Sequence, residues 1–126
     1  MQNHGVTIHL NNNYRIDLQE ILNAVGEVGK YSVWKISDAE CFGEEDEKIH
    51  NISDKEEEIS GEEFYKLVSG ICQTLGGCFD AYKTKENHWW LRIRSIRGDE
   101  FDIETEDNEL LDRIRKSFHD ITDLVY

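Results

Sequence analysis

Apolar and polar residues alternate at the start of the chain, in the segment GVTIHL. Val6, Ile8 and Leu10 share one side of an extended backbone, which predicts a strand. The asparagines at 11–13 signal a turn, and residues 14–16 are expected to return as a second short strand.

The segment after Asp17 has the spacing of an amphipathic helix. Asp17 and Glu20 are placed as in a capping box, and Gly29 is the expected end of this helix. The apolar residues that recur at helical spacing are Leu18, Ile21, Leu22 and Val25. The next segment, YSVWKIS, carries apolar residues on both faces, which favours an inner strand.

Ser60 begins the clearest helix signal in the chain. Glu63 follows it by three residues, and Ile59 and Phe64 flank the start as a hydrophobic staple. The helical stripe is expected to continue to the pair Gly76-Gly77, where the helix should stop. The members of this stripe are Phe64, Leu67, Val68, Ile71 and Leu75.

Three strands are expected next, in CFDAYKT, WWLRIRSI and EFDIETE, with turns at 85–87 and 97–99. Alternation places the arginines of the second strand opposite the carboxylates of the third in an antiparallel pair. These residues are Arg92, Arg94, Asp102 and Glu104.

A last amphipathic helix is predicted to begin at Asp107 or Asn108, both good N-caps. Its apolar stripe is spaced 3, 4, 3, 4 and reaches Val125. The stripe consists of Leu111, Ile114, Phe118, Ile121 and Val125.

The order of elements is therefore β(β)αβ, an acidic loop, then αβββα. Amphipathic helices need an apolar surface to cover, so we predict an α+β fold in which a single layer of helices packs on an antiparallel or mixed sheet of about five strands. The length suits one domain, and no repeat or linker divides residues 1–126.

The net charge is −13, and two segments hold the excess of acids. Residues 38–63 contain 12 acids and 2 bases, and residues 99–112 contain 8 acids and no base. This balance argues against binding to nucleic acid or to an anionic membrane, because both carry negative charge themselves. A basic protein, in contrast, would be attracted to the chain.

The chain contains three cysteines, Cys41, Cys72 and Cys78, and no two of them are closely spaced. An odd number of separated cysteines indicates reduced thiols and a cytoplasmic protein. No apolar run reaches the ~18 residues of a membrane span, and the first ten residues lack the pattern of a signal peptide.

Catalytic and metal signatures are missing from the sequence. The acidic stretch lacks the glycine and the ligand spacing of a calcium loop, and Cys41 and His50 are nine residues apart, which is not a zinc spacing. Acidic neighbours disfavour the Cys41 thiolate. We therefore expect neither an enzyme nor a cofactor.

Residues 43–63 allow two interpretations, a solvated loop or a surface that binds a partner. We predict the second, with eight carboxylates in contact with a basic protein: Glu44, Glu45, Asp46, Glu47, Asp54, Glu56, Glu57 and Glu58. Tyr82, Trp89 and Trp90 are the candidate aromatic anchors. On adjacent strand positions, one tryptophan should point into the core and the other outward.

The last two thirds of the chain contain ISGEEFYKLVSGICQTLGGCFDAY and WWLRIRSIRGDEFDIETEDNELLDRIRKSF. In size, acidity and layout this part resembles the small cytoplasmic immunity proteins of bacterial toxin systems, such as contact-dependent inhibition. The resemblance implies a toxin partner, often a basic nuclease or tRNA-cleaving domain. The group shares no motif, so it implies no particular site residue.

Two other functions are compatible with the sequence. One is a small metal-dependent hydrolase built on Asp102, Glu104, Glu106 and Asp107, of which strand alternation aligns the first three. The other is a general adaptor or oligomer subunit whose acidity keeps it in solution.

Overall fold

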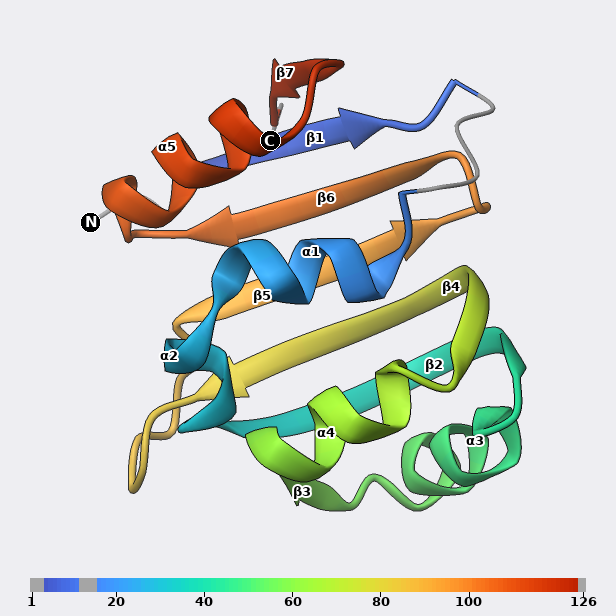
Figure 1. The fold of residues 1–126 in the computed structure, drawn as a ribbon. Helices are drawn as coiled ribbons and strands as arrows, with labels where there is room; N and C mark the ends of the chain where they lie inside the picture. The colour runs from blue at the N-terminus through green and yellow to red at the C-terminus, as the bar shows by residue number, and fades with distance from the viewer. Residues whose placement is uncertain (1–3, 12–15, 125–126) are drawn as a thin grey trace.

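The structure is a computed structural model that describes residues 4–11 and 16–124. In this part of the chain, seven strands form one antiparallel sheet in the order β3-β2-β4-β5-β6-β1-β7 (Figure 1). The strands are β1 (His4–His9), β2 (Val33–Gly43), β3 (Glu58–Ser60), β4 (Ile71–Tyr82), β5 (Leu91–Ile96), β6 (Glu100–Thr105) and β7 (Ile121–Asp123). The helices are α1 (Leu18–Val25), α2 (Glu27–Lys30), α3 (Asp46–Lys55), α4 (Gly61–Val68) and α5 (Asn108–Ser117).

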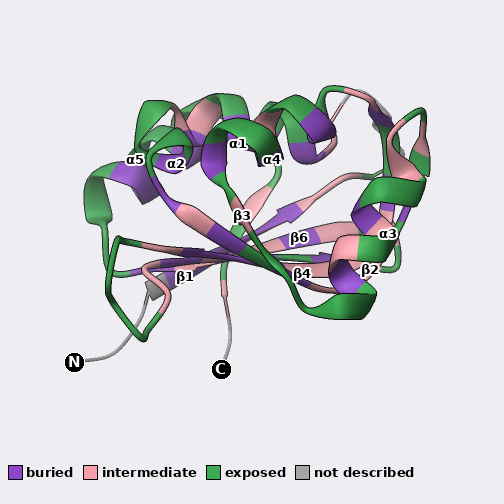
Figure 2. Cartoon of the chain, turned by 90° about the horizontal axis from the view of Figure 1, so that it is seen from below, coloured by how far each residue is buried: buried purple, intermediate pink, exposed green. Residues whose placement is uncertain are grey.

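The predicted α+β class is confirmed, with seven strands in place of about five. Helices α1, α2, α4 and α5 lie over one face of the sheet, whereas α3 lies apart from them at the far end of β2 (Figure 2). The helices of the described chain leave the other face uncovered. We call this uncovered side the open face.

The two additional strands come from segments that the sequence assigned otherwise. The acidic stretch is not a loop: β2 continues to Gly43, α3 follows, and β3 pairs with the start of β2. The last helix ends at Ser117, and Ile121 belongs to β7, which pairs with β1. The strand predicted at 14–16 and the final position of the stripe, Val125, lie largely outside the described residues.

The segment after α4 was also predicted wrongly. The helix ends at Val68, and residues 71–82 form β4, so Gly76 and Gly77 lie within a strand. Ile71 and Leu75 fit a helical repeat, but β4 hydrogen-bonds to both β2 and β5. Such long-range pairing overrides a local pattern that is compatible with either structure.

The starts of α4 and α5 follow the sequence signals closely. The Glu63 N–H donates to Ser60 Oγ at 3.2 Å, and the Leu110 N–H donates to Asp107 Oδ1 at 3.1 Å. The helix ends were predicted less well. Helix α1 ends at Gly26, which has φ of 78°, and not at Gly29 as predicted.

Aromatic rings form the centre of the core between the helices and the sheet. Trp34 of β2 and Phe64 of α4 are fully buried, with ring centroids 4.6 Å apart, and Phe79 of β4 lies 5.8 Å from Phe64. The Trp34 indole donates to Gly29 O at 2.8 Å, so its polar atom is satisfied.

No helix of the described residues has both the length and the apolar character needed to cross a membrane.

Candidate functional site

Helix α3 covers the edge of β2 that β3 leaves unpaired. Ser53 Oγ accepts from the Ala39 N–H at 3.1 Å, and His50 Nε2 accepts from the Cys41 N–H at 3.3 Å. Ile49 of the same helix is 1% exposed and belongs to the core. Uncovered strand edges promote association between chains, so the buried side of α3 has a structural role.

The predicted acidic residues lie on the other side of α3 and on its flanks. Glu44 and Glu45 precede the helix, and Glu56 and Glu57 follow it. Most of these carboxylates are exposed, and Glu45 and Asp46 are half-buried. Within the described chain, only two of the eight predicted carboxylates make an ion pair, Glu45 with Lys48 at 3.4 Å and Glu58 with Lys35 at 3.6 Å.

The second acidic segment lies elsewhere. Asp102 and Glu104 are on the open face of β6, which β4 and β5 separate from β2. Asp107 caps α5, and Glu109 lies in the first turn of that helix. The two acidic segments therefore form separate surfaces and not a single patch.

Charges of alternating sign cross the open face of the sheet. The ladder pairs place one charged residue of each of five neighbouring strands in a single row, which we call the charge row: Glu58, Lys35, Asp80, Arg92 and Glu104. Opposite charges at neighbouring positions stabilise a sheet. The sequence indicated only the last two members, because strand pairing across β2, β3 and β4 is not visible in it.

Asp80 and Arg92 form the strongest contact of the charge row. Arg92 Nε lies 2.7 Å from Asp80 Oδ1, and Arg92 Nη2 lies 2.8 Å from Asp80 Oδ2. These hydrogen bonds raise the pKa of the Arg92 guanidinium further above its ordinary value. The predicted facing of the two arginines and the two carboxylates is confirmed, with Arg92 opposite Glu104, but Arg92 binds Asp80 of the strand on its other side.

The three predicted aromatic anchors lie at one end of the sheet. Lys35 Nζ is 4.7 Å from the Tyr82 ring centre, and Arg92 Cζ is 4.6 Å from the Trp89 ring centre. Trp89 and Trp90 precede β5 and are not part of it as predicted. Trp90 packs against the core while Trp89 covers Arg92.

The structure thus brings together only part of the predicted site. Glu58 contacts Lys35, which contacts Tyr82, so these residues form a continuous surface. Glu44 follows the opposite end of β2, and ten residues of strand separate Val33 from that end, about 33 Å at 3.3 Å per residue.

Cys41 and His50 are close in the structure, although their nine-residue spacing in the sequence did not predict it. Cys41 Sγ lies 3.8 Å from His50 Nε2, but Cys41 is 2% exposed. Burial is the main cause, and the nearby carboxylates of Asp46 and Asp17 add to it; together they raise the pKa of the Cys41 thiol to about 11. The thiol is therefore protonated at neutral pH and is a poor nucleophile.

Alkaline pH should destabilise the fold through buried groups that resist ionisation. The Cys41 thiol and the Tyr65 hydroxyl, which donates to Gly26 O at 2.8 Å, both have a pKa raised by burial. The unfolded chain loses the Cys41 proton near pH 9 and the folded chain near pH 11, so the free energy of unfolding should fall across this window. Urea titrations from pH 8 to 11 measure it. Cys41→Ala should reduce the loss between pH 9 and 11, whereas the part due to Tyr65, which begins near pH 10, should remain. A constant midpoint in the parent chain would contradict the expectation.

The carboxylates of the alternative hydrolase do not converge. Asp102 accepts from Thr7 Oγ1 at 2.7 Å, Asp107 caps α5, and Glu106 lies beyond the end of β6. Across residues 4–11 and 16–124, no three His, Cys, Asp or Glu side chains gather in a way that would hold a metal ion.

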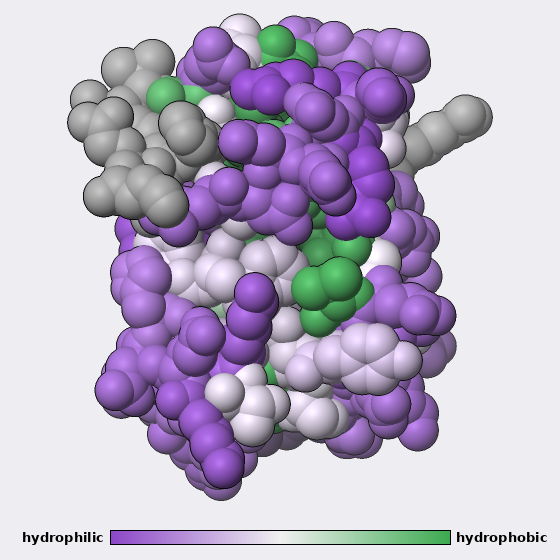
Figure 3. Space-filling model, turned by 90° about the vertical axis from the view of Figure 1, so that its left-hand side faces the viewer, coloured by the Kyte–Doolittle hydropathy of each residue, from purple (hydrophilic) through white to green (hydrophobic). Residues whose placement is uncertain are grey.

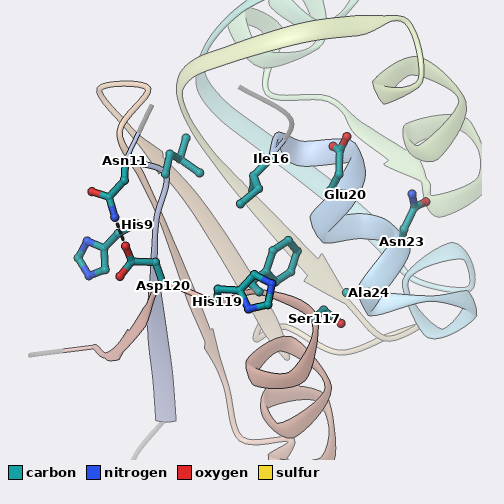
Figure 4. Close-up of a pocket in the computed structure, with 11 residues that line it drawn as sticks. His9, Asn11, Ile16, Glu20, Asn23, Ala24, Ser117, His119 and Asp120 are labelled. Atoms are coloured by element: carbon teal, nitrogen blue, oxygen red, sulfur yellow. Dashed lines mark hydrogen bonds between the residues drawn. The ribbon is translucent and has the colours of Figure 1, made fainter. Parts of the chain in front are cut away.

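A cavity of about 650 Å³ lies between β1, α1 and the connection from α5 to β7. His9, Asn11 and Asp120 lie together on one side of it, and Glu20 and Asn23 lie on the other (Figure 4). His9 contacts Glu100 and Thr122, and Asn11 donates to Asp120. His9, Asn11 and Asp120 are therefore already engaged in hydrogen bonds or ion pairs.

Comparisons with protein-family models, with curated proteins and with solved structures gave no match to this chain. Function therefore has to be inferred from the geometry and charge of the chain itself.

Proposed function

We propose that this chain binds and neutralises a basic protein, and that its partner is the toxic nuclease domain of a bacterial toxin. In this proposal the chain is a cytoplasmic immunity protein and not an enzyme. The observation that carries it is the carboxylate surface around α3, which includes six acids without an ion pair among the described residues. These are Glu44, Asp46, Glu47, Asp54, Glu56 and Glu57.

The contact between α3 and β2 does not use these charges. Ile49, His50 and Ser53 attach α3 to the edge of β2, and the exposed carboxylates contribute nothing to that contact. Like charges held close together repel one another and cost stability. Their presence on the free side of the helix is consistent with selection for a partner.

A nuclease supplies the matching surface. Its active site must attract the phosphates of nucleic acid, so the residues around it are positively charged. Complementary charge speeds the encounter of two proteins and disfavours wrong partners. Rapid capture protects a cell in which few toxin molecules are harmful.

The test begins with the gene next to the one for this chain, which we expect to encode a large secreted toxin. The toxic domain is expressed in bacteria with and without this chain, and colony formation is counted. We expect the chain to restore growth and the purified chain to abolish nucleic-acid cleavage in vitro. Growth arrest in the presence of correctly folded chain, together with undiminished cleavage, would refute the proposal.

A further inference from the structure

A second cavity lies at the end of the sheet where β4 connects to β5, with a volume of about 400 Å³. Figure 3 faces this end of the molecule and shows weakly polar and apolar surface between hydrophilic areas. Val28, which lines the cavity, is 48% exposed, and Tyr31, three residues further along, is 75% exposed. These exposed side chains add apolar surface at and near the cavity that a partner could cover.

The aromatic wall of the cavity is held rigidly. Trp90 donates from its backbone to Ala81 O at 2.8 Å and from its indole to Ser32 Oγ at 2.9 Å, and its carbonyl accepts from Thr105 Oγ1 at 2.6 Å. The neighbouring Trp89 stacks with His88 at 4.8 Å and lies over Arg92. A wall fixed before binding loses little entropy when a ligand arrives.

The charged residues of the lining favour a cation. They are Glu86, Glu106, Asp107 and Lys83, three carboxylates and one ammonium. The face of an indole ring attracts cations as well. An anion would be repelled by the carboxylates, and an apolar group would deprive them of water without replacing their hydrogen bonds.

We propose that this cavity receives an arginine side chain of the basic partner. A planar guanidinium can stack on the Trp90 indole and donate to a carboxylate at the same time, which an ammonium cannot do as well. Asp107 already accepts from the Leu110 N–H. Glu106 is exposed and makes no hydrogen bond or ion pair with the described residues, so it is the carboxylate that the arginine engages.

The inference rests on the proposed function for the identity of the partner, but the cavity can be tested alone. The probes are three capped tripeptides, Gly-Arg-Gly, Gly-Lys-Gly and Gly-citrulline-Gly, added to the full chain. Binding is followed by the NMR signals of the three indole N–H groups. Trp34 is fully buried and serves as the internal reference.

We expect the arginine peptide to shift the Trp90 signal with a dissociation constant on the order of 1 mM, and the neutral citrulline peptide to bind about fivefold more weakly. Glu106→Gln should weaken the arginine peptide about two- to fivefold, while Glu109→Gln should leave it unchanged. Glu109 makes the matched control because it is exposed, carries the same charge and lies outside the cavity.

Equal binding of the arginine and citrulline peptides would overturn the proposal, as would a lysine peptide that binds more tightly than arginine. So would a shift of the Trp34 signal as large as that of Trp90, because it would report a change of the whole fold. Failure here is distinct from failure of the proposed function. If the chain rescues growth but does not bind the arginine peptide, the proposal that the cavity binds arginine is refuted. If the chain binds the peptide but does not rescue growth, the proposal of a toxin partner is refuted.

Discussion

Replacing Glu56, Glu57 and Glu58 by lysine is expected to slow association with the basic partner at least about tenfold at low salt, because charge steering contributes factors of this size. The three residues are exposed and lie at the junction of α3 and β3. The defect should shrink as salt screens the interaction, so stopped-flow association rates are measured from about 0.05 to 0.5 M ionic strength.

A control with the same change of net charge separates position from total charge. Asp99, Glu109 and Asp112 are exposed and lie away from α3, and lysine at all three also changes the net charge by six. We expect a smaller effect for this variant. Equal rates for both triple variants would show that the α3 surface has no special part in the encounter.

Replacing Asp80 by alanine should lower the free energy of unfolding by about 2–4 kcal/mol, the cost of leaving a partly buried arginine without its partner. Asp80 is 8% exposed and holds both Arg92 Nε and Nη2. Urea unfolding, followed by tryptophan fluorescence, measures the change. Asp102→Ala on the same open face is the matched control, and because this carboxylate accepts from Thr7 alone we expect about 1 kcal/mol.

The double variant Asp80→Ala/Arg92→Met tests the cause. Removing the arginine as well removes the uncompensated charge, so the double variant should be more stable than Asp80→Ala alone. If the loss of stability in the double variant equals the sum of the losses in the two single variants, Asp80 and Arg92 do not act as a unit.

The α3–β3 junction and the aromatic cavity together define the surface that a partner would cover. Glu58, Lys35 and Tyr82 contact one another in sequence and connect the α3–β3 junction with the aromatic end of the sheet. A standard interface covers about 800 Å² of each protein, a patch roughly 30 Å across. One partner can therefore cover the junction and the aromatic cavity together, whereas Glu44–Glu47 lie at the limit of such a contact.

Local signals in the sequence were sufficient for the starts of α4 and α5 and for the last hairpin. Ser60 and Asp107 cap α4 and α5 as predicted, and the turn at 97–99 joins β5 to β6. The alternation in β5 and β6 also predicted correctly that the arginines of one strand face the carboxylates of the other. Each of these depends on residues that are neighbours in the chain, so the sequence alone determined them.

Tertiary structure decided whatever depends on pairing between distant segments. Residues 71–75 have a helical repeat, yet they form β4 because β2 and β5 supply hydrogen bonds along its length. The acidic stretch forms α3 because its apolar and polar residues fit the open edge of β2, a partner that lies outside the stretch itself. Arg92 binds Asp80 and not Glu104 for the same reason: two strands flank β5, and only the folded sheet decides which carboxylate its guanidinium reaches.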